Sequence, residues 1–247
     1  MRTHVVVPEL ISANGQNWKD RRLDAMPTIL QKLQSAPFTL VTDFKPSSQI
    51  YILDSSFNPP TISHLELGSY AGHNSLLLLL ATQNADKPMQ PASLEHRVKM
   101  MKLLAKSFHR CGIALTKHAY FVDKARAIEN HYPDKKQTFI VGYDTLVRIF
   151  DRKYDADGDM ELKLGCFFEH GHGLVSILRG ADQNQQEHFS NNIPDRWREQ
   201  IRFVPVLGDS TSSTAARNAI ASKDWSELKA LVPLDIANFI QTNNLYD

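Results

Sequence analysis

Two short segments place hydroxyl groups and cations where helices should begin, and this combination could bind phosphate. The first segment follows the apolar run 50–53 and reads Asp54-Ser55-Ser56-Phe57-Asn58-Pro59-Pro60-Thr61-Ile62-Ser63-His64. Small residues after a strand let backbone N–H groups approach an anion, and the two prolines force an extended turn before the helix. Thr61 falls at the start of that helix and His64 three residues later, on the same side of its first turn. Taken alone, Thr61 as an ordinary N-cap and His64 as a surface histidine is an equally good interpretation.

The second segment lies near the C-terminus and follows the apolar run 203–207. It reads Asp209-Ser210-Thr211-Ser212-Ser213-Thr214-Ala215-Ala216-Arg217. Ser212, Ser213 and Thr214 are typical N-cap residues and would open a helix that extends through Ala221. Arg217 follows Thr214 by three residues, so its guanidinium can reach the same helix end as a planar, two-pronged donor. By itself, this segment is merely a good cap beside a surface arginine.

Together the two segments resemble the signatures of the nicotinamide/nicotinate mononucleotide adenylyltransferase family, within the T/HxxH nucleotidylyltransferase superfamily. Residues 56–65 are similar to its GSFNPxTxxHL signature, and residues 211–217 to its ISSTxxR signature. Four further segments agree in order: 96–100 with the HRxxM helix, 141–146 with the GxDxL turn, 173–179 with the GLxxxxR strand, and 240–246 with the closing IxxxxLY. The resemblance covers about residues 49–247.

The resemblance implies an α/β chain with a Rossmann-like nucleotidylyltransferase fold, in which helices cover both faces of a parallel sheet. It implies an enzyme of NAD biosynthesis that joins nicotinamide or nicotinate mononucleotide to the AMP moiety of ATP and releases pyrophosphate. Because the attacking phosphate is already an anion, such a reaction needs positioning and charge neutralisation rather than a general base. The implied catalytic residues are Thr61, His64, Lys87 and Arg217, and Mg²⁺ is expected to accompany ATP.

The binding residues are implied by the same resemblance. ATP is expected to contact Ser55, Ser56, Phe57, His64, Gly142, Asp144, Ser212, Ser213, Thr214 and Arg217. The mononucleotide is expected to contact Phe57, Tyr120, Phe121 and Arg179. Gly142 and Asp144 also fit a tight turn with a capping residue, and Arg179 could instead pair with an acidic neighbour. Two departures stand out: Ser55 replaces the usual glycine, and no tryptophan lies where the family stacks the pyridine ring.

Three other groups of residues are assigned no role in the chemistry. The cations of the helix after residue 92 are expected on its solvated face: Arg97, Lys99, Lys102, Lys106 and Arg110. The acidic segment 155–159 opens like a calcium loop but lacks glycine at the sixth position and glutamate at the twelfth, so it is read as a turn. His170 and His172, with Cys166 nearby, lack a fourth ligand at a usual zinc spacing, and no metal site is expected there.

The elements that must position these residues follow from the apolar pattern. Apolar runs at 50–53, 76–80, 138–141 and 174–178 read as strands, and 92–106 carries a helical stripe of Leu94, Val98, Met101 and Leu104. Continuous apolar strands between amphipathic helices indicate a parallel sheet covered on both faces, whose ligands bind beyond the carboxyl ends of its strands. Residues 1–48 read as a partly helical N-terminal extension, with a helix around 18–33, before a nucleotidylyltransferase domain over 49–247.

Composition excludes several classes of protein. The 247 residues are 42% hydrophobic and 22% charged, which is ordinary for a globular chain, and the net charge of +1 gives no footprint for nucleic-acid binding. Two cysteines cannot build a disulfide framework, which favours a reducing compartment. The longest apolar run is far too short to span a membrane. We expect a cytoplasmic protein, with the nucleus as an alternative, that binds neither nucleic acid nor membrane; homo-oligomerisation is left open.

Two other functions remain open at this point. The altered pyridine pocket and the N-terminal extension would suit a divergent member that binds and slowly hydrolyses ATP, with a regulatory or protein-interaction role. Alternatively, the transferase chemistry could serve another acceptor, as in pantetheine-phosphate adenylyltransferases or cytidylyltransferases, although their C-terminal signatures differ. The sequence does not separate the amidated from the acid mononucleotide as substrate.

Overall fold

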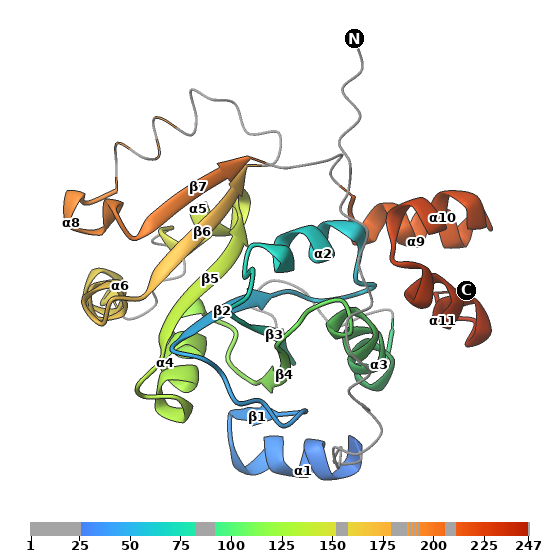
Figure 1. Ribbon diagram of the computed structural model, residues 1–247, viewed down its shortest axis with the longest axis horizontal. Coiled ribbons are helices and arrows are strands. Elements are labelled where there is room, and N and C mark those ends of the chain that lie inside the picture. Colours follow the sequence, from blue (N-terminus) through green and yellow to red (C-terminus); the bar gives the residue numbers. More distant parts are fainter. Residues whose placement is uncertain are drawn as a thin grey trace.

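The computed structural model describes residues 26–82, 92–151, 158–178, 193–205 and 211–246, together with residues 187, 189 and 191. Its centre is a seven-stranded sheet with the order β1-β4-β3-β2-β5-β6-β7 (Figure 1). The strands are β1 (Phe38–Leu40), β2 (Gln49–Asp54), β3 (Ser75–Ala81), β4 (Cys111–Thr116), β5 (Lys136–Gly142), β6 (Gly173–Leu178) and β7 (Ile201–Pro205). All neighbouring strands run parallel except β1, which pairs antiparallel with β4 at the edge.

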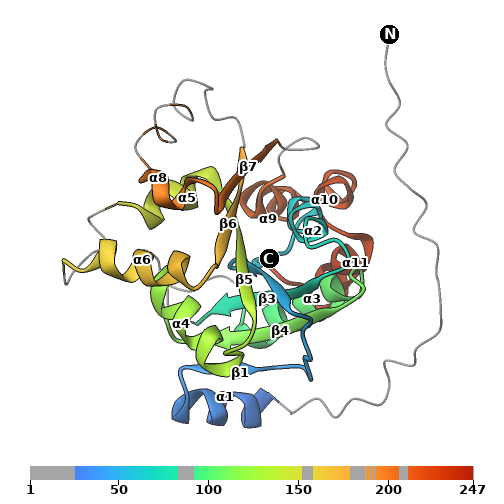
Figure 2. The same cartoon turned by 60° about the vertical axis from the view of Figure 1, so that its left-hand side comes forward.

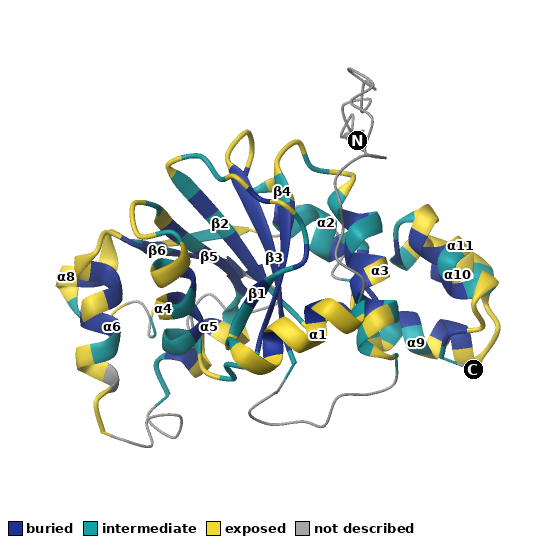
Figure 3. Ribbon diagram, turned by 90° about the horizontal axis from the view of Figure 1, so that it is seen from below, coloured by how far each residue is buried: buried dark blue, intermediate teal, exposed yellow. Residues whose placement is uncertain are grey.

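Helices cover both faces of the sheet. They are α1 (Met26–Ser35), α2 (Ile62–Ser69), α3 (Leu94–Ala105), α4 (Phe121–His131), α5 (Tyr143–Ile149), α6 (Met160–Glu169), α8 (Asp195–Arg198), α9 (Ser213–Ala221), α10 (Trp225–Leu231) and α11 (Leu234–Thr242). Helices α4, α5, α6 and α8 lie on one face, while α2, α3, α9, α10 and α11 lie on the other (Figures 2 and 3). None of the described helices is long and apolar enough to cross a bilayer.

The central strands are apolar on both sides because each face of the sheet is buried under helices. In β3, Leu77 and Leu79 join the core beneath α4 and α6, while Leu76, Leu78 and Leu80 join the core shared with α3, α9 and α11. All seven residues of β3 are buried, which explains the uninterrupted apolar run in the sequence.

The chain order of the strands creates a switch point between β2 and β5. From β2 the chain adds β3 and β4 on one side, and then crosses to add β5, β6 and β7 on the other. Crossover helices on either side of such a point diverge, which leaves a crevice beyond the carboxyl ends of the two central strands. We therefore expect a ligand position at the end of β2, directly before loop 55–61.

Most of the predicted elements are confirmed, and three strands were not predicted. The runs at 50–53, 76–80, 138–141 and 174–178 form β2, β3, β5 and β6, and the stripe at 92–106 forms α3. The strands that were not predicted are β4, the short antiparallel β1, and β7, where the apolar run 203–207 was noted but not read as a strand. The helix expected around 18–33 is described from Met26 onward, and its earlier residues lie outside the described part of the chain. Within the predicted extension, residues 26–48 contribute α1 and β1 to the same sheet and core as the residues that follow.

Candidate active site

The first segment singled out in the sequence, residues 54–64, lies at the switch point of the sheet. β2 ends at Asp54 and its neighbour β5 ends at Gly142, so the two carboxyl ends meet at the same edge. Loop 55–61 leads from β2 into α2, for which Thr61 is the N-cap. Gly142 in turn is the N-cap of α5. Both helix N-termini at this switch point therefore carry residues that the sequence singled out.

His64 is held between Thr61 and Ser55. The Thr61 N–H donates to His64 Nδ1 at 3.0 Å, and Thr61 Oγ1 lies 2.9 Å from the same nitrogen. Because Nδ1 accepts a hydrogen bond from a backbone N–H, the geometry assigns the ring hydrogen to Nε2. Nε2 lies 2.8 Å from Ser55 Oγ, so its hydrogen is donated to the Ser55 hydroxyl. His64 thus presents a fixed N–H donor at the start of α2, where an anion would bind.

The second segment is joined directly to the first, although the two are far apart in the sequence. Ser63 and Thr211 exchange hydrogen bonds: each backbone N–H donates to the other's side-chain oxygen, both at 3.0 Å. Ser213 Oγ donates to the carbonyl of Pro59 at 2.8 Å. These contacts place the N-terminus of α9 against loop 55–61, so the two segments form one site.

The start of α9 adds a helix N-terminus and a cation to this site. Ser212 is the N-cap, and its hydroxyl accepts a hydrogen bond from the Ala215 N–H at 3.0 Å. Arg217 Nη1 donates to the carbonyl of Asn58 at 2.7 Å, while Nη2 donates to Thr214 Oγ1 at 3.0 Å. Each helix N-terminus carries roughly half a positive charge, and the guanidinium adds a full one. The structure therefore brings Thr61, His64, Ser212, Thr214 and Arg217 together, as the sequence predicted.

The prediction for Arg97 is wrong. Lys99, Lys106 and Arg110 are exposed as expected, but Arg97 is only 1% exposed. Its Nε and Nη2 donate to the carbonyl oxygen of Ser56 at 2.8 and 2.5 Å, and burial lowers the pKa of its guanidinium. A loop carbonyl far away in the sequence replaces the water that a surface arginine would bind. The available signals were the HRxxM resemblance and the position of Arg97 one helical turn before Met101, on the buried side of α3.

Two further polar contacts at the site were not anticipated. Asp54, the last residue of β2, forms an ion pair with Lys124 of α4, whose Nζ lies 2.6 Å from Oδ2. The Tyr246 hydroxyl donates to Asn58 Oδ1 at 2.8 Å, and burial raises the pKa of this phenol well above its usual range. The closing IxxxxLY segment pointed to Tyr246, but no local pattern paired Lys124 with Asp54.

The three aromatic residues expected to contact the mononucleotide differ in their surroundings. Tyr120 is the N-cap of α4 and is 43% exposed. Phe121 packs into the core, with its ring 4.8 Å from Phe139 and 5.1 Å from Phe167. Phe57 is fully buried, 5.2 Å from the His64 ring. The binding roles of these three side chains stay predictions.

The remaining predicted residues divide into two groups. Asp144 lies exposed in the first turn of α5, and a Cβ at Gly142 would meet no atom within 4 Å, so space does not require glycine there. Lys87 and Arg179 lie outside the described residues. Their predicted contacts with phosphate stay predictions.

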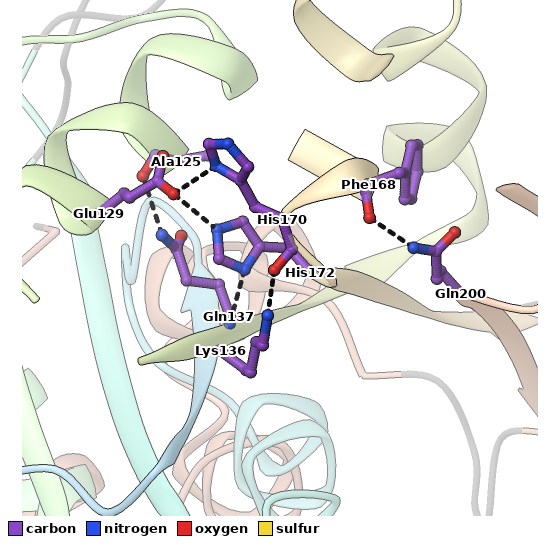
Figure 4. Close-up of polar contacts among 8 residues, drawn as sticks. All are labelled: Ala125, Glu129, Lys136, Gln137, Phe168, His170, His172 and Gln200. Carbon is purple, nitrogen blue, oxygen red and sulfur yellow. Dashed lines mark hydrogen bonds and ion pairs between the residues drawn. The ribbon is translucent and has the colours of Figure 1, made fainter. Parts of the chain in front are cut away.

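Glu129, His170 and His172 gather at the opposite edge of the sheet, where β5 and β6 begin (Figure 4). Glu129 Oε1 lies 2.5 Å from His170 Nδ1 and 3.5 Å from His172 Nε2. The Gln137 N–H donates to His172 Nδ1 at 3.1 Å, which assigns the ring hydrogen to Nε2. A histidine that binds a metal through Nε2 must instead carry its hydrogen on Nδ1. The buried backbone contact therefore disfavours a metal at this cluster, and burial lowers the pKa of His172.

Comparisons with known proteins agree with this geometry. The chain is 38% identical over 214 residues to a Schizosaccharomyces pombe protein named as a nicotinamide mononucleotide adenylyltransferase, and the match covers 80% of this chain and 86% of the relative. It is 26% identical over 210 residues to a Chlorobium phaeobacteroides protein named as a nicotinate-nucleotide adenylyltransferase, covering 80% and 99% of the two chains. No family model matches the chain.

Among solved structures, the fold resembles that of Plasmodium falciparum nicotinic acid mononucleotide adenylyltransferase complexed with NaAD. The TM-score is 0.59 at 18% identity, over 81% of this chain and 98% of the other. At that identity the likeness is one of fold, and it agrees with the predicted Rossmann-like nucleotidylyltransferase architecture.

Proposed function

Because this chain belongs to the nicotinamide/nicotinate mononucleotide adenylyltransferase family, we propose that it joins a pyridine mononucleotide to the AMP moiety of ATP. A phosphate oxygen of the mononucleotide forms a bond to the α-phosphorus of ATP, and the bond from that phosphorus to the bridging oxygen breaks. The electron pair of that bond leaves with pyrophosphate. No proton has to be removed from the nucleophile, so the protein's task is to align the two phosphates and to neutralise their charge.

The observation that carries this proposal is the direct contact between the two helix N-termini. Ser63 and Thr211 hold the start of α9 against the start of α2, and the sequence signatures of both halves of the site lie at this junction. The His64 Nε2–H would exchange the Ser55 hydroxyl for a phosphate oxygen, and Arg217 lies beside the same loop. A preorganised donor at a developing charge is worth about 10²–10³ in rate, which these groups could supply.

Magnesium is proposed to enter as part of the substrate, bound to ATP. Mg²⁺ keeps several waters and takes substrate phosphates with few protein carboxylates. Asp54, the carboxylate at the end of β2, is paired with Lys124. This pairing favours coordination of the ion by the ATP phosphates, and the charge of the ion would assist departure of pyrophosphate.

The substrates beyond ATP and the cellular setting are also proposals. Either nicotinamide mononucleotide or nicotinate mononucleotide is the acceptor, supported by the names of the relatives. A cytoplasmic location, with the nucleus as an alternative, is supported by the two unpaired cysteines. Homo-oligomerisation stays open and would be decided by light scattering of the purified chain.

The test is dinucleotide formation by the purified protein. ATP and Mg²⁺ are incubated with either mononucleotide, and the products are separated by anion-exchange chromatography. We expect NAD or its deamido form together with an equal amount of pyrophosphate. His73→Ala, on an exposed turn after α2, is the control and should match the wild type, while His64→Ala should lose most activity. Loss of ATP without dinucleotide would reject the proposal in favour of a hydrolytic or regulatory role.

A further inference from the structure

The carbonyl oxygen of Ser56, within loop 55–61, is bound by a cation from another part of the fold. Both Nε and Nη2 of Arg97 donate to this oxygen, at 2.8 and 2.5 Å. Arg97 lies in the first turns of α3, just after the N-cap Ser93, and is 1% exposed. Burying a guanidinium is unfavourable unless its donors are satisfied. The fold therefore keeps a buried cation in place by directing its Nε and Nη2 donors at the Ser56 carbonyl.

These two hydrogen bonds fix the direction of the Ser56–Phe57 peptide. A trans peptide is planar, and its C=O and N–H groups point in opposite directions. With the Ser56 carbonyl turned toward Arg97, the Phe57 N–H points away from α3. Phe57 is fully buried and has a φ of 47°, a conformation that a residue with a large side chain adopts only when its surroundings hold it. None of the described residues accepts a hydrogen bond from this N–H.

The direction of this peptide matters more than that of its neighbours. The carbonyls of Asn58 and Pro59 are held in a similar way, by Arg217 and Ser213. In the peptide bonds that these two carbonyls belong to, the nitrogen is that of Pro59 or Pro60, and a proline nitrogen cannot donate a hydrogen bond. If the Ser56–Phe57 peptide turned over, a carbonyl oxygen would replace an N–H donor at the start of α2, and that oxygen would repel an anion.

We propose that Arg97 is a positioning residue for adenylyl transfer, which clamps the Ser56 carbonyl so that the Phe57 N–H is presented to a phosphate oxygen of ATP. This inference rests on the proposed function, because it takes the triphosphate as the ligand of loop 55–61. A phosphate oxygen that displaces the Ser55–His64 hydrogen bond gains a donor that is otherwise buried without a partner. Lysine cannot replace Arg97, because its single ammonium group lacks the planar pair of donors.

The variant Arg97→Lys tests this inference, since it keeps the charge but loses the paired donors. We expect kcat/KM for ATP to fall about ten- to hundredfold, while KM for the mononucleotide and the unfolding temperature stay near the wild-type values. Lys99→Met removes an exposed cation from the same helix and is the control, expected to behave as the wild type. An unchanged kcat/KM for ATP, measured per folded molecule, would mean that Arg97 is only structural and would overturn the inference. If Arg97→Lys does not fold, Arg97→Gln replaces it, because its amide can still donate one uncharged hydrogen bond.

Calorimetric titration with Mg·ATP separates this inference from the proposed function. If the wild type forms no dinucleotide, the proposed function fails, yet weakening of ATP binding by tenfold or more in the Arg97 variant still supports the clamp. Equal ATP affinity in wild type and variant overturns the clamp, whether or not dinucleotide is made. A wild type that binds no ATP overturns it as well.

Discussion

Replacing His64 by asparagine should separate its role in folding from its role in the reaction. Two contacts of the ring decide the comparison: Nδ1 accepts from the Thr61 N–H, and Nε2 donates to Ser55 Oγ, toward the position proposed for phosphate. Asparagine carries an oxygen on Cγ, at the same place in the side chain as Nδ1, but has no atom at the position of Nε2. Alanine lacks both atoms. The two variants therefore share the loss of the donor and differ in the contact with the helix N-terminus.

The magnitudes follow from these contacts. Loss of the side-chain contact at the start of α2 should cost His64→Ala about 1 kcal/mol of unfolding free energy, or about 2–4 °C in Tm for a chain of this length. His64→Asn should stay within about 0.5 kcal/mol of the wild type, since only intrinsic helix propensity changes. Both variants lose the same donor to the transition state, so both should lose about 10²-fold in kcat.

The assay combines thermal unfolding by circular dichroism with dinucleotide formation measured per folded molecule, and His73→Ala again serves as the control. Two results would refute the reasoning. The first is a kcat of His64→Asn within threefold of the wild type, which would remove Nε2 from the mechanism. The second is a Tm for His64→Asn as low as that for His64→Ala, which would mean that the Thr61 contact does not stabilise α2.

Three further predictions concern single contacts. Ser55→Gly removes the hydroxyl that accepts from His64 Nε2, so KM for ATP should fall by about two- to tenfold, the worth of one neutral hydrogen bond; a higher KM would contradict this. Asp54→Asn leaves the Lys124 charge buried and should cost about 3 kcal/mol in urea unfolding, whereas adding Lys124→Met should recover part of that loss. Burial lowers the pKa of His172, so below about pH 6.5 the unfolded chain binds more protons. As the pH is lowered from 7 to 5, the unfolding free energy should therefore decrease more steeply for the wild type than for His172→Gln. Urea titrations across this range would measure the difference.

The strands that sequence reasoning found and missed differ in their side chains. β3 is a run of leucines buried on both faces, and such a run has few alternatives to a central parallel strand. β4 contains a glycine and an alanine, so its apolar signal is weak. The reason for Gly112 is tertiary: a Cβ there would lie 2.3 Å from the Phe44 ring. The short β1 gains its place only by pairing with β4, far along the chain, and nothing in its three residues indicates that partner.

Arg97 shows why a buried cation is hard to recognise from sequence. A charged residue on a helix is normally solvated, and four other cations within the same fourteen residues made a solvated face the natural interpretation. What overrides that preference is the Ser56 carbonyl, which reaches Arg97 only after the sheet has placed the end of β2 beside α3. Propensity and periodicity carry no information about such a contact. The available signals were the resemblance of residues 96–100 to a family signature and the place of Arg97 one helical turn before Met101, and both indicated a position without giving its partner.

The two interpretations of Thr61 and His64 are compatible in one arrangement. The sequence left an ordinary helix cap and a phosphate site as equal alternatives, as if one excluded the other. In the structure the Thr61 N–H binds His64 Nδ1, and this same contact leaves the hydrogen on Nε2, where a phosphate can accept it. The contact that fixes the helix end therefore also fixes the tautomer of the donor. It follows that a substitution at Thr61 that frees Nδ1 should lower activity even if α2 stays folded, because the ring could then place its hydrogen on either nitrogen.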